Sequence, residues 1–239
     1  MDELYARQYR ELYERHWWWR ARERLLVREL ARRTPPAGFG SILDVGCGDG
    51  LLFPCLTHLG TVDGVEPNPE VVTTRGRSLG TIHVCPFDAS FEPGRTYGLI
   101  LLLDLLEHLA DPRAALARAR ALLEPGGLVL VTVPAFPILW TSQDDVNDHL
   151  RRYRRRDIEE LARSAGLTVD ELRHFFHWVF PAKLVVRLAE RLTRAPIGRA
   201  TIPPTPLNTL LVGLSLLEQR LTARMPLPFG GSLFAVLSS

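Results

Sequence analysis

The chain has 239 residues, of which 46% are hydrophobic and 23% charged, and its formal net charge at pH 7 is +2. This composition is typical of a globular protein and excludes a disordered chain, while the length fits one α/β domain with an insertion. A net charge near zero gives no bulk electrostatic argument for a nucleic-acid partner.

Neither a membrane span nor a secretion signal is apparent in the sequence. No apolar run reaches the length needed to cross a bilayer. The first 33 residues are rich in Arg and Glu and lack the apolar core of a signal peptide. We therefore expect a cytoplasmic protein, and peripheral contact with a membrane stays open.

Three cysteines, Cys47, Cys55 and Cys85, stand far apart, without a CxxC pair or His/Cys ligand spacing. This spacing does not support a structural zinc site. Free thiols in a reducing compartment are the better interpretation. We expect no metal site.

Strong helix formers with charges of both signs predict a helix over residues 3–33, within an N-terminal segment 1–36. It contains three adjacent tryptophans, Trp17, Trp18 and Trp19, which cannot all face one side of a helix. We expect at least one to pack on the body of the protein and Trp18 to contact a substrate. The alternative, in which all three only anchor the helix, stays open.

Short apolar segments then alternate with helical patterns between residues 37 and 177. Strands are predicted at 41–45, 61–65, 81–85, 97–102, 128–133, 167–176 and, as the last strand within 232–239, at 232–237; helices are predicted at 50–58, 69–78, 112–123 and 157–165. Such alternation predicts an α/β fold with a doubly wound, seven-stranded, mostly parallel sheet. We expect the Pro125-Gly126-Gly127 turn to end the helix that precedes it.

Two long segments interrupt the alternation: a loop at 134–153 and an insertion at 178–231. The insertion holds two amphipathic helical stretches around a proline-rich segment at 196–206. Long excursions from a compact core tend to be lids or binding elements. We therefore expect a helical cap before the last strand, within a single domain spanning 1–239.

The segment DVGCGDG, residues 44–50, follows one predicted strand and opens a predicted helix. Its glycines let the backbone turn sharply and approach a ligand, and the amides at a helix N-terminus can bind an anionic group. Glu66 ends the next strand, where a carboxylate can accept hydrogen bonds from two ribose hydroxyls. The spacing G-x-G-x-G differs from the dinucleotide fingerprint G-x-G-x-x-G, so an NAD-dependent oxidoreductase is a weaker alternative.

These segments resemble, in order, the motifs of class I S-adenosylmethionine-dependent methyltransferases. ILDVGCGDG is similar to their first motif, GVEPNP to the acidic motif of the second strand and FDAS to the segment near the adenine. YGLILLLDLLEHLADP resembles their fourth-strand motif, with an ending seen in ubiquinone-pathway O-methyltransferases, and LLEPGGLVLVTVP resembles the segment before the fifth strand. The ordered set covers residues 41–134 and is far more specific than one glycine motif.

The resemblance implies a Rossmann-like methyltransferase fold that binds S-adenosylmethionine. The residues that it places at this cofactor are Asp44, Gly46, Cys47, Gly48, Gly50, Glu66, Pro67, Asp88, Ala89, Leu103 and Asp104. The flanking segments HWWWRARE and LWTSQDDVNDHLRRY are similar to those of a bacterial group of these enzymes, and so are Pro206, Asn208 and Glu218. That second resemblance does not fix the methyl acceptor.

Methyl transfer from a sulfonium to a hydroxyl is helped by a general base, for which His is the usual residue. His149 lies in the loop that contributes to the acceptor pocket in this fold, and His108 follows the fourth strand. We prefer His149 as the acceptor-side base. Two structural alternatives stay open: a lid-anchoring contact for His149 and a turn-capping hydrogen bond for His108.

Six residues, 151–156, form a run of five arginines around Tyr153. Arg152 and Tyr153 are candidate contacts to an anionic acceptor, because Arg side chains bind carboxylates and phosphates. The alternative is the solvated start of a helix, with charges countered by Asp157, Glu159 and Glu160. A nucleic-acid substrate is not favoured, since no aromatic stacking module accompanies the run.

The apolar stretch 207–221 is too short to span a membrane. It could line an acceptor pocket or face a membrane surface, or it could pack as part of an ordinary cap. We expect methyl transfer, most readily to oxygen, on a small-molecule or a lipid- or sugar-linked acceptor. A non-catalytic S-adenosylmethionine-binding module is the alternative from another class, and the sequence leaves the oligomeric state undetermined.

Overall fold

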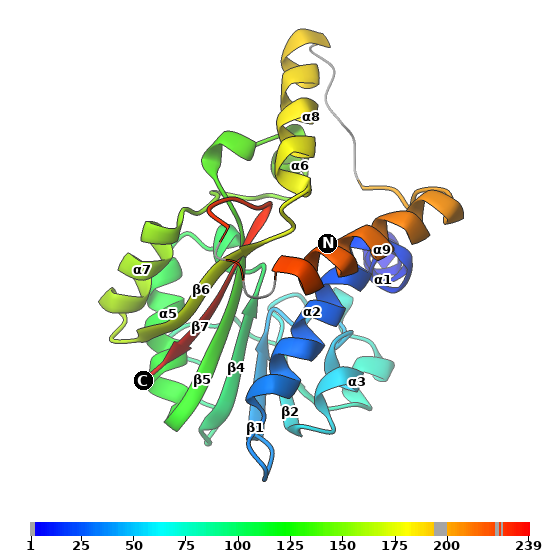
Figure 1. Ribbon diagram of the computed structural model, residues 1–239. Coiled ribbons are helices and arrows are strands. Elements are labelled where there is room, and N and C mark those ends of the chain that lie inside the picture. The colour runs from blue at the N-terminus through cyan, green and yellow to red at the C-terminus, as the bar shows by residue number, and fades with distance from the viewer. Residues whose placement is uncertain (1–2, 194–199, 223–224, 226) are drawn as a thin grey trace.

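A seven-stranded sheet forms the centre of the computed structural model, which describes residues 3–193, 200–222, 225 and 227–239. The strands are β1 (Gly40–Val45), β2 (Gly60–Val65), β3 (Thr81–His83), β4 (Tyr97–Leu103), β5 (Leu123–Pro134), β6 (Thr168–Phe175) and β7 (Ser232–Ser238). Their order is β3-β2-β1-β4-β5-β7-β6 (Figure 1). Only β7 runs antiparallel to its neighbours, which confirms the predicted mostly parallel sheet.

The strand order places the functional edge. The chain runs from β1 outward to β2 and β3, then crosses back to β4 on the other side of β1. The topological switch point therefore lies between β1 and β4, and in doubly wound sheets ligands bind there, beyond the carboxyl ends of the strands. The loops after β1, β2 and β4 meet at this edge.

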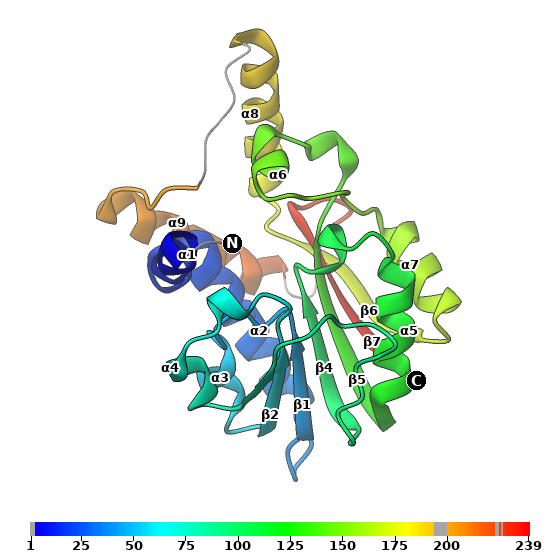
Figure 2. The same cartoon turned by 180° about the vertical axis from the view of Figure 1, so that it is seen from behind.

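Each face of the sheet carries its own hydrophobic cluster, because successive side chains of a strand point to opposite faces. In β1, Leu43 and Val45 belong to one cluster and Ile42 to the other. Helices α5 (Pro112–Leu122) and α7 (Arg155–Ser164) cover the first face. Helices α2 (Trp17–Arg33) and α3 (Phe53–Leu56) cover the second, as Figure 2 shows from behind.

The predicted N-terminal helix is wrong at one residue. It is two helices, α1 (Glu3–Arg15) and α2, separated by His16, whose backbone is extended. The His16 Nδ1 atom accepts a hydrogen bond from the Trp18 N–H at 3.1 Å, which caps α2. Trp17 and Trp18 both pack on Phe176, so the tryptophan cluster does anchor the helix to the body.

Two other helix predictions and one turn prediction differ from the structure. The predicted helix at 50–58 is only α3, and that at 69–78 is a 3-10 turn, η1 (Pro69–Val71), followed by α4 (Thr74–Arg77). The Asp49 carboxylate accepts hydrogen bonds from the Thr73 N–H and hydroxyl, which stops a continuous helix there. The Pro-Gly-Gly turn does not end α5, which stops at Leu122, but lies inside β5, with Gly126 at φ +77°.

The two interruptions of the alternation are structured. The loop after β5 holds η3 (Pro137–Leu139) and α6 (Ser142–Val146), and a further 3-10 turn, η2 (Leu106–His108), follows β4. The insertion holds α8 (Val179–Thr193) and α9 (Thr205–Thr222). The proline-rich segment between them lies partly outside the described residues. Helix α9 packs along α2, whereas α8 projects away from the sheet (Figure 1).

Candidate active site

The glycine loop after β1 adopts backbone angles that its sequence permits. Gly46, Gly48 and Gly50 have φ of +73°, +55° and +64°, a region that residues with a Cβ rarely adopt. The Gly46 N–H donates to the Val65 carbonyl at 2.8 Å, which ties the loop to the end of β2. A Cβ built at Gly48 would meet nothing within 4 Å, so open space lies beside this part of the loop.

Glu66 faces the glycine loop across the sheet edge. Its carboxylate accepts from the Gly48 N–H at 3.1 Å and from the Asn68 N–H at 2.9 Å. Burial raises the pKa of Glu66, and the two backbone hydrogen bonds counter part of that effect. Pro67, the next residue, is exposed at the same edge.

Two aspartates lie at the ends of the central strands. Asp44 is buried at the end of β1, and burial, aided by the Glu66 charge and opposed by Arg22, raises its pKa to about 7. Asp104 follows Leu103, the last residue of β4, and its N–H donates to the Thr132 carbonyl at 2.8 Å. The predicted glycine loop and acidic residues therefore converge on the switch point.

Arg22 of α2 also lies at this edge, although it was not among the residues predicted from the sequence. The Arg22 Nε atom lies 2.5 Å from the Asp104 Oδ2 atom, and its guanidinium lies 5.6 Å from the Trp18 ring centroid. Burial opposes the charge of Arg22, but Asp104 and other partners raise its pKa overall. The four-residue spacing of Trp18 and Arg22, which suits stacking on one helix face, was the available signal.

The predicted adenine-side segment is the most exposed part of the site. The Asp88 carboxylate accepts from the Ser90 N–H at 2.8 Å and from its hydroxyl at 2.6 Å, and these bonds lower the pKa of Asp88. Asp88 and Ala89 are both exposed. Their contact with a cofactor stays a prediction.

On the acceptor side, a buried carboxylate organises the loop after β5. Asp144, 1% exposed, lies 2.9 Å from His149 Nδ1 and accepts from Arg152 Nε at 2.8 Å and from the Thr141 N–H at 2.9 Å. Burial would raise the pKa of Asp144, but His149, Arg152 and Lys183 together hold it well below its usual range. An ionised Asp144 fixes His149 through Nδ1 and leaves Nε2 outside this contact.

His108 and Glu107 lie beside His149. The His108 and His149 ring centroids are 4.9 Å apart, and burial, then the neighbouring His149, lower the pKa of His108. Glu107 is buried, and burial followed by the Asp104 charge raises its pKa strongly. Ligand atoms of Glu107, His108 and His149 lie within 4.8 Å of one another, a spacing that also suits a metal ion and that the sequence did not suggest.

The predicted substrate contacts Arg152 and Tyr153 are buried. Arg152 Nη1 donates to the Ala135 carbonyl at 2.9 Å, and the Tyr153 hydroxyl donates to the Leu106 carbonyl at 2.8 Å. These bonds hold the His149 loop against the ends of β4 and β5. A role in substrate binding stays a prediction for both, as for Trp18 on α2.

Backbone strain is concentrated at the same edge. Four residues other than glycine have positive φ in the described chain: Asp104, Phe136, Asp148 and Phe176. Three of them lie at or just beyond the ends of β4, β5 and β6, and Asp148 directly precedes His149. Such conformations are costly and tend to persist at functional sites.

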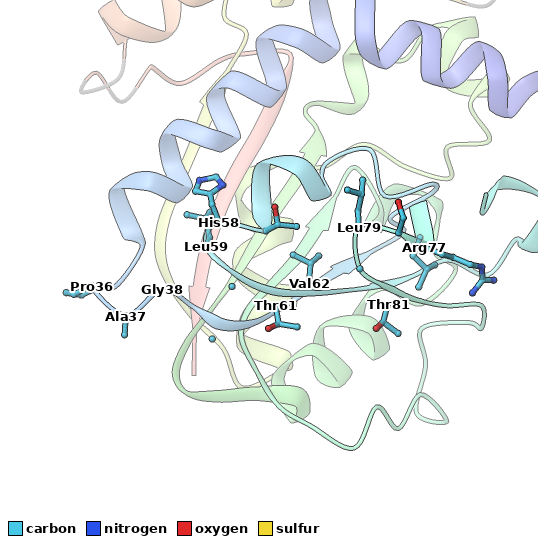
Figure 3. Close-up of a pocket in the computed structure, with 16 residues that line it drawn as sticks. Pro36, Ala37, Gly38, His58, Leu59, Thr61, Val62, Arg77, Leu79 and Thr81 are labelled. Atoms are coloured by element: carbon cyan, nitrogen blue, oxygen red, sulfur yellow. The ribbon is translucent and has the colours of Figure 1, made fainter. Parts of the chain in front are cut away.

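A broad hollow opens elsewhere, at the amino ends of β1, β2 and β3. Its volume is about 1040 Å³, and Gly38, His58, Thr61, Arg77 and Thr81 are among its lining residues (Figure 3). Because the glycine loop and Glu66 lie at the opposite ends of these strands, this hollow is separate from the candidate site.

Known proteins share these features. The family described as "Methyltransferase domain" matches residues 18–172, more than half of the chain. A ubiquinone biosynthesis O-methyltransferase of Thiobacillus denitrificans is 29% identical over 170 residues, which cover 62% of this chain and 72% of that one. Other relatives with that name match over less than half of their own length, as in the 43% of the Parvibaculum lavamentivorans protein.

Solved structures support the fold. A Haloferax volcanii methyltransferase, in complex with the Trm112 activator, superposes with a TM-score of 0.61 at 20% identity, covering 98% of this chain and 93% of that one. Phosphoethanolamine N-methyltransferase 2 of Haemonchus contortus, in complex with S-adenosylmethionine, superposes with a TM-score of 0.58 at 18% identity. The superposition covers 90% of this chain and 52% of that one. Together with the family match, the ordered motifs and their convergence at the switch point, this establishes that the chain belongs to the class I S-adenosylmethionine-dependent methyltransferases.

Proposed function

We propose that this methyltransferase transfers the methyl group to an oxygen atom of a small-molecule or a lipid- or sugar-linked acceptor, with His149 as the general base. The observation that carries this proposal is the Asp144–His149 pair, whose atoms lie 2.9 Å apart beside the cofactor edge. The ubiquinone-pathway names of the relatives support oxygen as the methylated atom.

The residues at the switch point suit S-adenosylmethionine. The open space beside Gly48 admits a ligand against the loop backbone, and the Glu66 carboxylate suits the two ribose hydroxyls. Asp44 and Asp104 offer negative charge to a cationic ligand. We assign cofactor binding to Asp44, Gly46, Cys47, Gly48, Gly50, Glu66, Pro67, Asp88, Ala89, Leu103 and Asp104, and add Arg22 as the residue that positions Asp104.

When bound, S-adenosylmethionine supplies a methyl group on a positively charged sulfur. The protein must align the acceptor with that methyl group and receive a proton. His149 Nε2 takes the proton of the acceptor hydroxyl while the oxygen forms its new bond to carbon and the carbon–sulfur bond breaks. Asp144 keeps the other ring nitrogen protonated, and its charge stabilises the imidazolium that forms.

Trp18, Arg152 and Tyr153 complete the proposed acceptor side, with His108 next to the base. The proposed organisation is one domain, with an N-terminal helical segment at 1–36, a donor-binding core at 37–177, a helical cap at 178–231 and a last strand at 232–239. We further propose that the enzyme is cytoplasmic and associates peripherally with a membrane surface. Among the described residues, no helix is both long and apolar enough to cross a bilayer.

The experiment combines cofactor binding with an acceptor panel. Isothermal titration calorimetry measures binding of S-adenosylmethionine and S-adenosylhomocysteine. Release of S-adenosylhomocysteine is then followed with matched phenol, alcohol, amine and thiol acceptors. We expect micromolar binding and turnover on a hydroxyl acceptor that His149→Gln reduces without weakening cofactor binding.

Turnover on amines alone would overturn the assignment of oxygen. Cofactor binding without turnover on any acceptor would favour the non-catalytic module. If folded protein binds neither compound, the donor-site assignment fails, and NAD binding in its place would point to the oxidoreductase alternative.

A further inference from the structure

Helix α9 carries its apolar side on the outside. Five leucines, Leu207, Leu210, Leu214, Leu217 and Leu221, are 42–66% exposed and recur at intervals of three and four residues. The residues buried on the opposite side are Asn208, Val212, Ser215 and Gln219, three of which are polar. A surface helix of a globular protein normally has the reverse arrangement, with its apolar stripe toward the core.

Specific hydrogen bonds fix this orientation. Asn208 accepts from the Trp17 N–H at 2.8 Å and donates to the Arg15 carbonyl at 2.7 Å, so it joins α9 to the break between α1 and α2. Gln219 donates to the Ala21 carbonyl at 3.1 Å. Turning the leucines inward would break these bonds and leave buried polar groups without partners, so the leucine face is a built feature of the fold.

Helix α8 repeats the arrangement. Its Val185, Leu188 and Leu192 side chains are 57–77% exposed. Its polar side chains turn toward the loop after β5: Glu190 accepts from the Ser142 hydroxyl at 2.5 Å, and Arg187 donates to the Ile138 carbonyl. Both cap helices therefore hold the body with polar groups and present branched apolar side chains outward.

The charge of the cap is as distinct as its hydrophobicity. Residues 178–231 contain seven Arg or Lys and two Glu, a net charge of +5, whereas the rest of the chain has 22 basic and 25 acidic residues, a net charge of −3. Both glutamates are engaged: Glu190 with Ser142, and Glu218 with the His177 and Trp178 N–H groups at 2.9 and 2.7 Å. Two of the basic residues also contact the body: Lys183 Nζ lies 4.0 Å from Asp144 Oδ2, and Arg187 donates to the Ile138 carbonyl. The cap thus combines exposed leucines with an excess of positive charge.

We infer that the outer faces of α8 and α9 dock on an anionic lipid bilayer surface. Leucine-rich faces with basic residues are the chemistry by which interfacial helices bind anionic membranes. Helix α8 projects from the body and α9 lies along α2 (Figures 1 and 2). Two exposed apolar faces on separate helices favour one extended surface over a single partner helix. This docking specifies the membrane contact proposed above. Its use in reaching a lipid-linked acceptor rests on the proposed function, whereas vesicle binding can be measured without methyl transfer.

The test is co-sedimentation of the full chain with vesicles. We expect binding to vesicles of phosphatidylcholine mixed with phosphatidylglycerol, weaker binding to phosphatidylcholine alone, and weakening by added salt. The triple variant Leu210→Gln, Leu214→Gln, Leu217→Gln should bind mixed vesicles at least about tenfold more weakly. Val84→Gln, which alters an exposed apolar residue beyond β3, is the matched control and should bind as the unmodified chain does.

Circular dichroism and calorimetry with S-adenosylmethionine verify that each variant is folded, so failure to fold is separable from failure to bind. Folded unmodified protein that ignores mixed vesicles would overturn the inference, and so would full binding by the triple variant. A dimer detected by light scattering, abolished by the triple variant and without vesicle binding, would assign the leucine face to self-association instead. Because no arm measures methyl transfer, the proposed function can fail independently.

Discussion

The Arg22 guanidinium and the Asp104 carboxylate form an ion pair that joins the N-terminal helices to the end of β4. Their Nε and Oδ2 atoms are 2.5 Å apart, and both side chains are largely buried, at 10% and 22% exposure. On the other side of the donor loop, Arg10 of α1 pairs with Asp49. The N-terminal segment therefore contacts the proposed cofactor site through two ion pairs.

Replacing Arg22 by Met should destabilise the fold by roughly 3 kcal/mol, because removing one partner leaves the other charge buried and unpaired. We also expect S-adenosylmethionine to bind at least about tenfold more weakly. Urea unfolding and calorimetry measure the two effects. Arg20→Met, two residues away on the same helix but exposed, is the matched control.

The double variant Arg22→Met, Asp104→Asn separates the pair from the individual side chains. Asn tolerates the positive φ of Asp104 and removes the unpaired charge, so the double variant should be more stable than Arg22→Met alone. Equal or lower stability would mean that Arg22 acts through packing on Trp18 and not through Asp104.

Glu66→Gln should weaken S-adenosylmethionine binding by about tenfold to a hundredfold, equivalent to roughly 1.4–2.7 kcal/mol. The substitution replaces a carboxylate that accepts two backbone hydrogen bonds by an amide with one acceptor oxygen. Calorimetry measures the change. Glu70→Gln, exposed on the adjacent turn, should bind normally; similar losses in both variants would point to a general effect of charge.

Most of the cofactor edge was predictable because its determinants are local. Gly46, Gly48 and Gly50 require only the backbone freedom of glycine, and Glu66 requires only its place at the end of an apolar strand. Strand order then brings them together without further information. By contrast, the break at His16 comes from a side chain that caps α2, which a helical pattern does not reveal.

The acceptor side was predictable only in part, because it depends on tertiary contacts. The sequence indicated His149 but not Asp144, although they are five residues apart. Their pairing depends on the positive φ of Asp148 and on the hydrogen bond from Arg152 Nη1 to the Ala135 carbonyl. Neither feature is encoded in a sequence periodicity. The leucines at 207–221 were evident, but which side of α9 is buried depends on Asn208 and Gln219 finding partners on other helices.

His16 should make stability depend on pH. Burial lowers the pKa of folded His16 to about 4, from an ordinary value of 6.5. Between these pH values the unfolded chain binds a proton at His16 that the folded chain does not. The contribution of neutral, buried His16 to the free energy of unfolding is therefore fully present above pH 6.5 and is lost as the pH falls toward 4. The loss is at most roughly 3 kcal/mol.

His16→Asn tests this, since Asn supplies a side-chain oxygen that can cap α2 in place of the His16 Nδ1 atom and does not titrate. As the pH falls from 7 to 4, we expect the free energy of unfolding to fall more in the unmodified protein than in His16→Asn, so that the variant becomes relatively more stable. The raised pKa of Asp44 has the opposite slope, because the folded chain then holds the extra proton. Taking the difference at each pH cancels it, and a difference independent of pH would refute the prediction.

The Asp144–His149 pair makes a prediction that a purely structural role does not share. Asp144→Asn should lower kcat by about a hundredfold or more with little change in cofactor binding. Because Asn cannot hold the same ring tautomer of His149, the loss should fall on kcat and not on cofactor binding. Asp145→Asn, exposed and adjacent, is the matched control and should keep its kcat.

His149→Gln should lower kcat at least as far as Asp144→Asn does, because Gln cannot act as a base. Since Gln can still donate to Asp144, its thermal stability should change less than its activity. A chelator addresses the alternative raised by Glu107 and His108. A metal ion on His149 Nε2 would occupy the lone pair that accepts the proton, so the same nitrogen cannot serve as base. Turnover that is lost with EDTA and restored by a divalent cation would therefore make His149 a metal ligand, whereas turnover unaffected by EDTA leaves it free to act as the base.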